Sequence, residues 1–147
     1  MKMSREIKYR AWLKNRNKMV EVEEIDFLAQ KQIAYDEIEY RYTDKEPFHY
    51  TQWVDFDEIE LLQYVELKDK NNIEIYDGYI LQNEQGRKFV IEYKFGGFNL
   101  VPIEYYKDEF SWNAMGDMQC AGFIQESCKI IGNVYQNKEL LENEKED

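Results

Sequence analysis

The stretch that decides the fold is LLQYVELKDKNNIEIYDGYIL, residues 61–81. Apolar-rich segments flank a polar connection at residues 68–72, which is typical of two strands joined by a tight turn. The pair Asp77-Gly78 follows, and it suits a bend or bulge because glycine adopts positive φ without strain. The stretch therefore predicts the central hairpin of a β-rich protein, followed by a further strand.

Strand patterns continue on both sides of this hairpin. Upstream, residues 5–23 predict an N-terminal hairpin, and residues 38–42 alternate as a strand with one wet face. Downstream, residues 88–94 (KFVIEYK) predict a strand, and residues 123–124 and 130–135 return to strand. Many short strands at close spacing favour a mainly β barrel or roll.

Helical signals are few and lie in the C-terminal third. Asn137 is a suitable N-cap for a short helix through Leu141. Residues 104–118 fit either a short helix or an irregular excursion. We therefore predict a single domain of 147 residues, with N-terminal strands over 5–42, a barrel core over 59–135 and a short helix over 137–143.

Residues 43–57, TDKEPFHYTQWVDFD, are rich in aromatic side chains but show no steady period, and they predict a long loop. Rigid aromatic rings provide contact area at low entropic cost, which makes such a loop a candidate binding surface. The candidate interaction residues in it are Phe48, Tyr50, Trp53 and Phe56. The alternative is that the rings pin the loop to the protein's own core.

Charge is unevenly distributed along the chain. The net charge is −11, but the first 18 residues carry +6 and the remainder −17. A body this acidic repels a phosphate backbone, so nucleic acid could bind only at the basic N-terminal hairpin. The candidate interaction residues in that hairpin are Arg5, Lys8, Arg10, Trp12 and Lys14. The alternative is that the basic hairpin lies against acidic residues of the same subunit or of a neighbour.

No set of residues for catalysis or metal binding stands out. His49 is the only histidine, and no nucleophile motif accompanies it. Cys120 and Cys128 are too far apart for a zinc knuckle, and they predict free thiols in a reducing cytosol. The first twelve residues lack the apolar region of a signal peptide. We expect a cytoplasmic, non-enzymatic protein with no catalytic residues, cofactor, metal or membrane partner.

Three segments of the chain resemble the YopX family, small proteins of phages and prophages in Gram-positive bacteria. They are residues 5–12 (REIKYRAW), residues 62–78 within the deciding stretch, and residues 131–141 (IGNVYQNKELL). The resemblance implies a small barrel of the Src-homology-3 type with extra strands and a helical C-terminal tip. It also implies homo-oligomers, and it supplies no biochemical activity.

The chain departs from the family pattern at a few positions. Where the family has Thr-Gly before the polar turn, this chain has Val65-Glu66, and Asn72 replaces the glycine of the turn itself. Tyr79 replaces an Asp after Gly78, and Lys138 replaces a Pro. These departures argue against chemistry in the deciding stretch.

Three hypotheses of function follow. The first is a phage-encoded interaction module that self-assembles, with the basic hairpin pairing with carboxylates of a neighbouring subunit and Trp12 packed between them. The second is an acidic inhibitor that occupies the basic groove of a host defence or nucleic-acid-binding protein. The third is a binder of small ligands or single-stranded nucleic acid through the aromatic loop.

Overall fold

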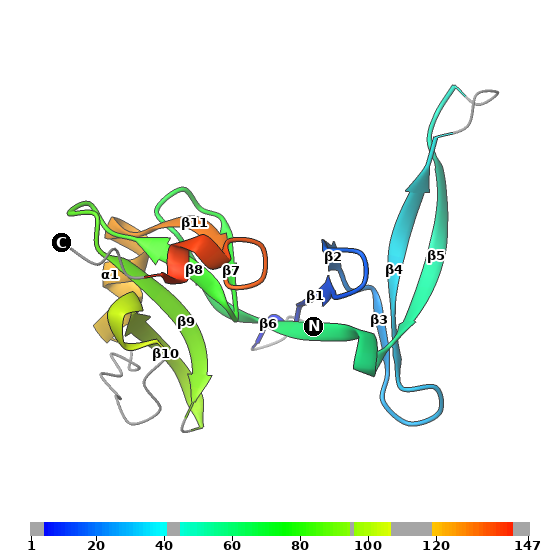
Figure 1. Cartoon of the computed structure of the whole chain (residues 1–147), viewed down its shortest axis with the longest axis horizontal. Coiled ribbons are helices and arrows are strands. Elements are labelled where there is room, and N and C mark those ends of the chain that lie inside the picture. The colour runs from blue at the N-terminus through cyan, green and yellow to red at the C-terminus, as the bar shows by residue number, and fades with distance from the viewer. Residues whose placement is uncertain (1–4, 41–44, 95, 107–118, 143–147) are drawn as a thin grey trace. The chain divides into compact units, whose positions relative to one another are not determined.

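A computed structural model describes residues 5–40, 45–94, 96–106 and 119–142, with side chains in the last range described from Ala121 onward (Figure 1). The strands are β1 Tyr9–Leu13, β2 Lys18–Glu21, β3 Glu24–Asp26, β4 Gln32–Glu39, β5 Phe48–Asp55, β6 Ile59–Lys68, β7 Glu74–Tyr76, β8 Tyr79–Gln82, β9 Lys88–Lys94, β10 Gly97–Pro102 and β11 Lys129–Asn133. The helices are η1 Phe56–Glu58, η2 Ile103–Tyr105, α1 Gln119–Ser127 and η3 Lys138–Leu141. The prediction of a mainly β fold of the small-barrel type with a short C-terminal helix is confirmed.

The chain divides into two compact units. The N-terminal unit comprises residues 8–62, and the C-terminal unit comprises residues 1–7 and 63–147. Strand β6 belongs to both units, because the boundary falls between Leu62 and Gln63 in the middle of that strand. Each unit is described by itself below.

The N-terminal unit contains an antiparallel hairpin and an antiparallel three-stranded sheet. Strands β1 and β2 form the predicted hairpin, in which Arg10 lies opposite Glu21 and Leu13 opposite Lys18. A second sheet has the order β3-β4-β5, and β4 pairs with β5 along the full length of both strands.

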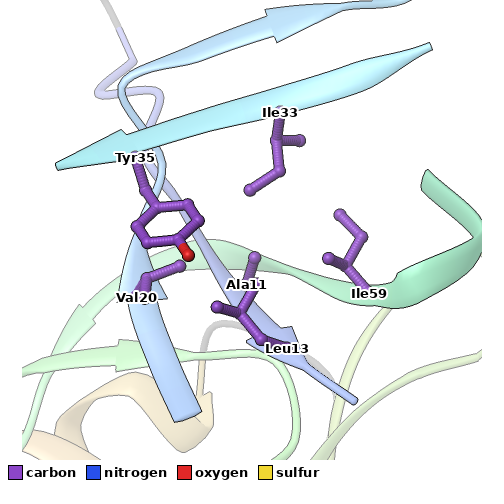
Figure 2. Close-up of a cluster of buried hydrophobic side chains, with 6 residues drawn as sticks. All are labelled: Ala11, Leu13, Val20, Ile33, Tyr35 and Ile59. Atoms are coloured by element: carbon purple, nitrogen blue, oxygen red, sulfur yellow. The ribbon is translucent and has the colours of Figure 1, made fainter. Parts of the chain in front are cut away.

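The core of the N-terminal unit is a cluster of alternate side chains from four strands (Figure 2). Strands β1 and β4 each contribute two members that are two residues apart, because side chains alternate between the faces of a strand, and β2 and β6 contribute one member each. Burying an aliphatic side chain contributes about 1.5–3 kcal/mol, so a cluster of this size is the main stabilising term of the unit. Its buried members are Ala11, Leu13, Val20, Ile33, Tyr35 and Ile59.

The prediction of an aromatic loop at 43–57 is wrong where the structure describes it. Residues 48–55 form strand β5, and residues 56–58 form the short helix η1; residues 43 and 44 lie outside the described part. The strand was hidden in the sequence because aromatic side chains occupy both of its faces. Phe48 and Tyr50 point to one face and Trp53 to the other, which removes the hydrophobic period of two.

The C-terminal unit contains the sheet β10-β9-β8-β11, and the second half of β6 pairs with β7. Strand β9 covers the predicted residues 88–94, and Gly78 makes the predicted bend at φ 83°. The rings of Tyr64, Tyr76 and Tyr79 pack against one another in turn at tilted angles, with centroids 5.5 Å and 5.7 Å apart, and all three are buried. The departure from the family at Tyr79 therefore supplies a core aromatic.

Helix α1 corrects the strand predicted at residues 123–124. Two adjacent apolar residues, Phe123 and Ile124, lie on a helix whose Ile124 is 2% exposed. A run this short has no period that distinguishes a strand from a buried helix. Cys128, just after the helix, is buried, whereas residues 107–118 and the side chain of Cys120 lie outside the described part.

The polar turn of the deciding stretch is held by one buried carboxylate. Asp69 is 4% exposed. Its Oδ1 accepts hydrogen bonds from the backbone N–H groups of Asn71 and Ile73, both 2.9 Å long. Its Oδ2 accepts from the N–H of Ile130 on β11 at 3.0 Å, so the turn is tied to a strand 61 residues away. The conformation of this turn is therefore a determinant of the fold.

A second side-chain-to-backbone hydrogen bond holds the C-terminal end of β11. Asn137 precedes η3 as predicted, but its side chain makes no capping bond. Its Oδ1 instead accepts a hydrogen bond from the backbone N–H of Asn133 at 3.1 Å. Gly132 lies directly against this amide, since a Cβ at Gly132 would meet Asn137 Cγ at 2.6 Å.

Gly132→Ala should destabilise the protein by about 1–3 kcal/mol, because the added methyl group displaces the Asn137 side chain and breaks its bond to β11. The matched control is Gly122→Ala on helix α1, where nothing lies within 4 Å of an added Cβ. That variant should be neutral or more stable, by up to about 1 kcal/mol, since alanine favours helix. Thermal or urea unfolding measures both, and equal stabilities of the two variants would contradict the role of Gly132.

Candidate interaction surface

The far half of the β4-β5 hairpin, residues 36–40 and 45–53 and here called the arm, is largely exposed. Along the core face of β4, Ile33 and Tyr35 are 0% and 1% exposed. Residues directly opposite in an antiparallel pair share a face, so Tyr50 opposite Glu37 and Phe48 opposite Glu39 continue that same face. There Phe48 and Tyr50 are 42% and 37% exposed, and their rings stack with centroids 6.0 Å apart.

The opposite face of the hairpin is also apolar. Trp53 is 41% exposed and lies opposite the buried Ala34. Ile38 is 45% exposed and lies opposite His49, and Tyr40 just after β4 is 82% exposed. Contiguous exposed apolar side chains on a soluble protein commonly mark an interaction site. The arm therefore presents apolar groups on both of its faces.

A charged network separates the core from the arm. Arg16 donates to Glu37 Oε1 and to the Tyr35 hydroxyl, both at 2.7 Å, and Lys18 Nζ lies 3.5 Å from Glu37 Oε2. The hydrogen bond from Arg16 and the charge of Lys18 lower the pKa of Glu37 against the opposing effect of burial. Burial raises the pKa of Tyr35, and the charge of Glu37 adds to this. The network closes the core with polar groups at the point where β1 and β2 no longer cover the hairpin.

His49 and Asp36 form a pair on the outer face of the arm. His49 Nδ1 lies 2.7 Å from Asp36 Oδ2, and the two side chains are 55% and 40% exposed. Such exposed pairs contribute little to stability. We therefore assign His49 and Asp36 as an exposed surface pair.

The candidate residues of the N-terminal hairpin form ion pairs with carboxylates of the same chain or are at least partly buried. In the C-terminal unit Arg5 pairs with Glu66 at 2.7 Å, and in the N-terminal unit Lys14 pairs with Glu60 at 3.5 Å. Trp12 is only 9% exposed in one copy. The remaining two, Lys8 and Arg10, are half-buried.

Among the aromatic candidates, Phe56 differs from the others. It is half-buried, packs against the core cluster, and meets Phe27 edge-on with centroids 5.9 Å apart. The structure therefore brings Phe48 and Tyr50 together on the arm and leaves Phe56 at the opposite end of β5.

Sequence reasoning did not select Ile38 and Tyr40 as surface residues. Their alternation predicts a strand with a buried face, and this interpretation holds only where another strand covers that face. The signal that could have found them is length. The hairpin strands β4 and β5 each have eight residues, whereas β1 and β2 have five and four.

Two hollows lie in the part of the chain that the structure describes, and neither has the size and apolar walls of a usual small-molecule site. One in the N-terminal unit has a volume of about 230 Å³, and one in the C-terminal unit about 400 Å³. Small-molecule sites usually enclose about 300–1,000 Å³ with apolar walls. The larger hollow is instead lined by Tyr64, Glu66, Lys68, Asp69, Lys70, Asn72 and Gln125.

Two side chains of the C-terminal unit, Asp77 and Tyr106, have raised pKa values. Burial raises the pKa of Asp77, and the charge of Glu92 adds to this against hydrogen bonds from the N–H groups of Tyr93 and Gly78. Burial also raises the pKa of Tyr106, with contributions from Glu92 and Asp77. Within the described residues, no group of three or more His, Cys, Asp or Glu side chains could hold a metal ion.

These observations define a mainly β protein of the small-barrel class that carries an exposed aromatic arm. A family model described as YopX protein matches residues 8–142, which include all but the first seven and the last five residues of the chain. The chain belongs to the YopX family. The match spans both compact units.

A solved structure shares this fold. The crystal structure of protein EF1440 from Enterococcus faecalis superposes with a TM-score of 0.63 at 23% sequence identity, covering 95% of this chain and 100% of that one. At this identity the likeness shows the fold alone. No curated protein matches the sequence. In the part of the chain that the structure describes, no helix is both long and apolar enough to cross a membrane.

Replacing Glu37 by Gln should lower stability at neutral pH by about 2 kcal/mol, because it removes a charge-assisted bond to Arg16. The pKa of Glu37 is lowered in the folded state. Its contribution is therefore complete above its unfolded value near 4.5 and is lost as pH falls through the lower folded value. The difference in unfolding free energy between wild type and variant should shrink below about pH 4.

Chemical unfolding from pH 3 to pH 7 measures this effect, with the exposed Glu23→Gln as the control. A wild-type-to-variant difference that does not change with pH would contradict the assignment of the network to Glu37.

Proposed function

We propose that this chain is a non-enzymatic interaction module that self-assembles through the arm. The observation that carries the proposal is strand β5, an edge strand in which every residue except Val54 is exposed. That strand presents Phe48, Tyr50 and Trp53 to solvent. Family membership supports a phage origin and a place in the cytoplasm of the bacterial host as part of the proposal.

The energetic reason for assembly is the arm's lack of a covering layer. An isolated two-stranded hairpin is marginally stable in water, and a hairpin with apolar side chains gains stability when another surface covers them. A second copy of the chain supplies such a surface, because it presents the same aromatic groups and closes the contact by symmetry.

The charge pairs point to an apolar contact between copies instead of an ionic one. Arg5 and Lys14 are engaged with Glu66 and Glu60 of their own chain. Salt screens surface charges but leaves apolar burial intact or strengthens it. Assembly should therefore persist when the salt concentration rises.

The double variant Phe48→Ser, Tyr50→Ser should weaken association at least about 100-fold, because each buried aromatic contributes roughly 1.5–3 kcal/mol. The matched control is Tyr93→Ser in the C-terminal unit, which removes an aromatic side chain that is 55% exposed. Sedimentation velocity over a concentration series, at low and high salt, measures association. Equal assembly of the double variant and the control would overturn the proposal, as would a wild-type monomer at roughly 50 µM, where interfaces of standard size are populated.

An acidic inhibitor of a nucleic-acid-binding protein is the second candidate. It is favoured because cations of the N-terminal hairpin are neutralised within the chain, while Glu21, Glu23 and Glu24 are exposed. Such a surface suits a partner with a basic groove. Under this candidate, exchanging the three glutamates for glutamine should reduce retention of a purified basic DNA-binding protein at moderate salt about tenfold, since each screened pair contributes up to about 1 kcal/mol. Unchanged retention would remove its support.

A third candidate is binding of small ligands or single-stranded nucleic acid. The stacked rings of Phe48 and Tyr50 favour it, because bases stack on aromatic side chains. The carboxylates of Glu39 and Glu46, in and beside the same hairpin, act against a phosphate backbone. Quenching of Trp53 fluorescence by an oligonucleotide would favour this candidate over self-assembly.

A further inference from the structure

The free edge of β5 differs from the other strand edges of the protein. In the described sheets the outer strands are β2, β7, β10, β11, β3 and β5. Strands β3 and β7 have three residues each and β2 has four. Strand β10 ends at Pro102, and β11 contains a register shift between Ile130 and Gly132. Short length, proline and bulges are the devices that prevent edge-to-edge pairing, and β5 has eight residues with none of them.

The backbone groups that face this edge follow from the hydrogen bonds of the sheet. The N–H of Phe56 donates to the carbonyl of Lys31, so Phe56 points toward β4. The carbonyl of Ala34 accepts from the N–H of Glu23, just before β3, so Ala34 faces the β3 side and its odd-numbered neighbours on β4 bond β5. Because inward and outward groups alternate along an antiparallel strand, the N–H and C=O groups of the odd-numbered residues of β5 point away from β4. They belong to His49, Thr51, Trp53 and Asp55.

The side chains of this edge suit a second copy of the same strand. Residues 48–54, FHYTQWV, contain no Asp, Glu, Lys or Arg. When two identical strands lie antiparallel over this segment, no like charges stand opposite one another, which would otherwise oppose pairing. The apolar side chains on both faces of β5 then gain neighbours on both faces of the joined sheet.

We infer that β5 pairs edge to edge and antiparallel with β5 of a second copy, which joins two three-stranded sheets into one. The inference rests on the proposed self-assembly and names the backbone contact by which it occurs. A two-fold axis across the pair makes the contact the same in both copies. The joined sheet ends on each side at β3, whose three residues are a poor template for further pairing.

Amide hydrogen exchange tests this contact in the wild-type chain. The outward amides of His49, Thr51 and Trp53 should exchange at least about tenfold more slowly above the association midpoint than below it. The inward amides of Tyr50 and Gln52 should be slow at both concentrations, because β4 protects them in one copy. Outward amides whose exchange does not change with concentration, whether fast or slow, would overturn the inference.

A pair of variants at Thr51 separates backbone pairing from side-chain contact. Thr51→Pro removes an outward N–H, a change that edge strands tolerate, and should weaken association about tenfold or more. Thr51→Val keeps the N–H and the branched shape and should associate like the wild type. Thermal unfolding of both variants checks that the fold is intact, and the exchange pattern above decides the case if Thr51→Pro fails to fold.

The failures of the two proposals are distinguishable. If Thr51→Pro assembles normally while Phe48→Ser, Tyr50→Ser does not, the copies meet through side-chain faces, and edge pairing is overturned while self-assembly stands. If the double variant also assembles normally, the arm is not the contact and both proposals fall.

Discussion

The buried carboxylate of Glu37 is the interaction on which the N-terminal unit depends. Apolar burial can extend along the β4-β5 hairpin only as far as β1 and β2 reach. At that point a charged side chain pairs with cations of the same chain. Arg16 and Lys18, from the β1-β2 turn and the start of β2, converge on Glu37: Arg16 donates to its Oε1, and the Lys18 ammonium lies 3.5 Å from its Oε2. Glu37 is buried while Arg16 and Lys18 are about half exposed, so the network lies at the boundary between the core and solvent. The same contact thereby fixes where the core ends and where the exposed arm begins.

The C-terminal unit relies on polar groups in a different way. Asp69 and Asn137 each use side-chain oxygens to hold backbone N–H groups, so the residues most typical of the family serve the fold. Two positions where the family has glycine have positive φ here, at 65° for both Glu66 and Asn72. Asparagine tolerates that region, whereas a residue such as glutamate is strained in it by about 1 kcal/mol. The exposed ion pair of Glu66 with Arg5 offsets at most part of that strain.

Elements with a clear local signal could be predicted from the sequence. KFVIEYK is rich in branched and aromatic residues and forms β9, and Asp77-Gly78 makes the bend because glycine takes its positive φ there. Strand β5 could not be predicted in the same way, because aromatic side chains on both faces erase the period that identifies a strand. Phe48, Tyr50 and Trp53 could be selected as candidates from their chemistry. Their exposure arises because β4 and β5 are longer than β1 and β2. That difference becomes apparent only when the strands are compared in the folded structure, and no single segment of the sequence shows it.

An uncovered edge strand exposes a protein to aggregation, so its retention in β5 requires a physical explanation. A head-to-tail contact through such an edge would extend without limit, whereas an antiparallel contact between identical edges uses both of them and leaves none open. The distribution of edge protection agrees with the second case. Strand β3, at the far side of the same sheet, has only three residues, so pairing two copies through β5 leaves only poor edges. In this arrangement the length of β5, the neutrality of residues 48–54 and the shortness of β3 have a single physical explanation: they permit one pairing event and prevent the next.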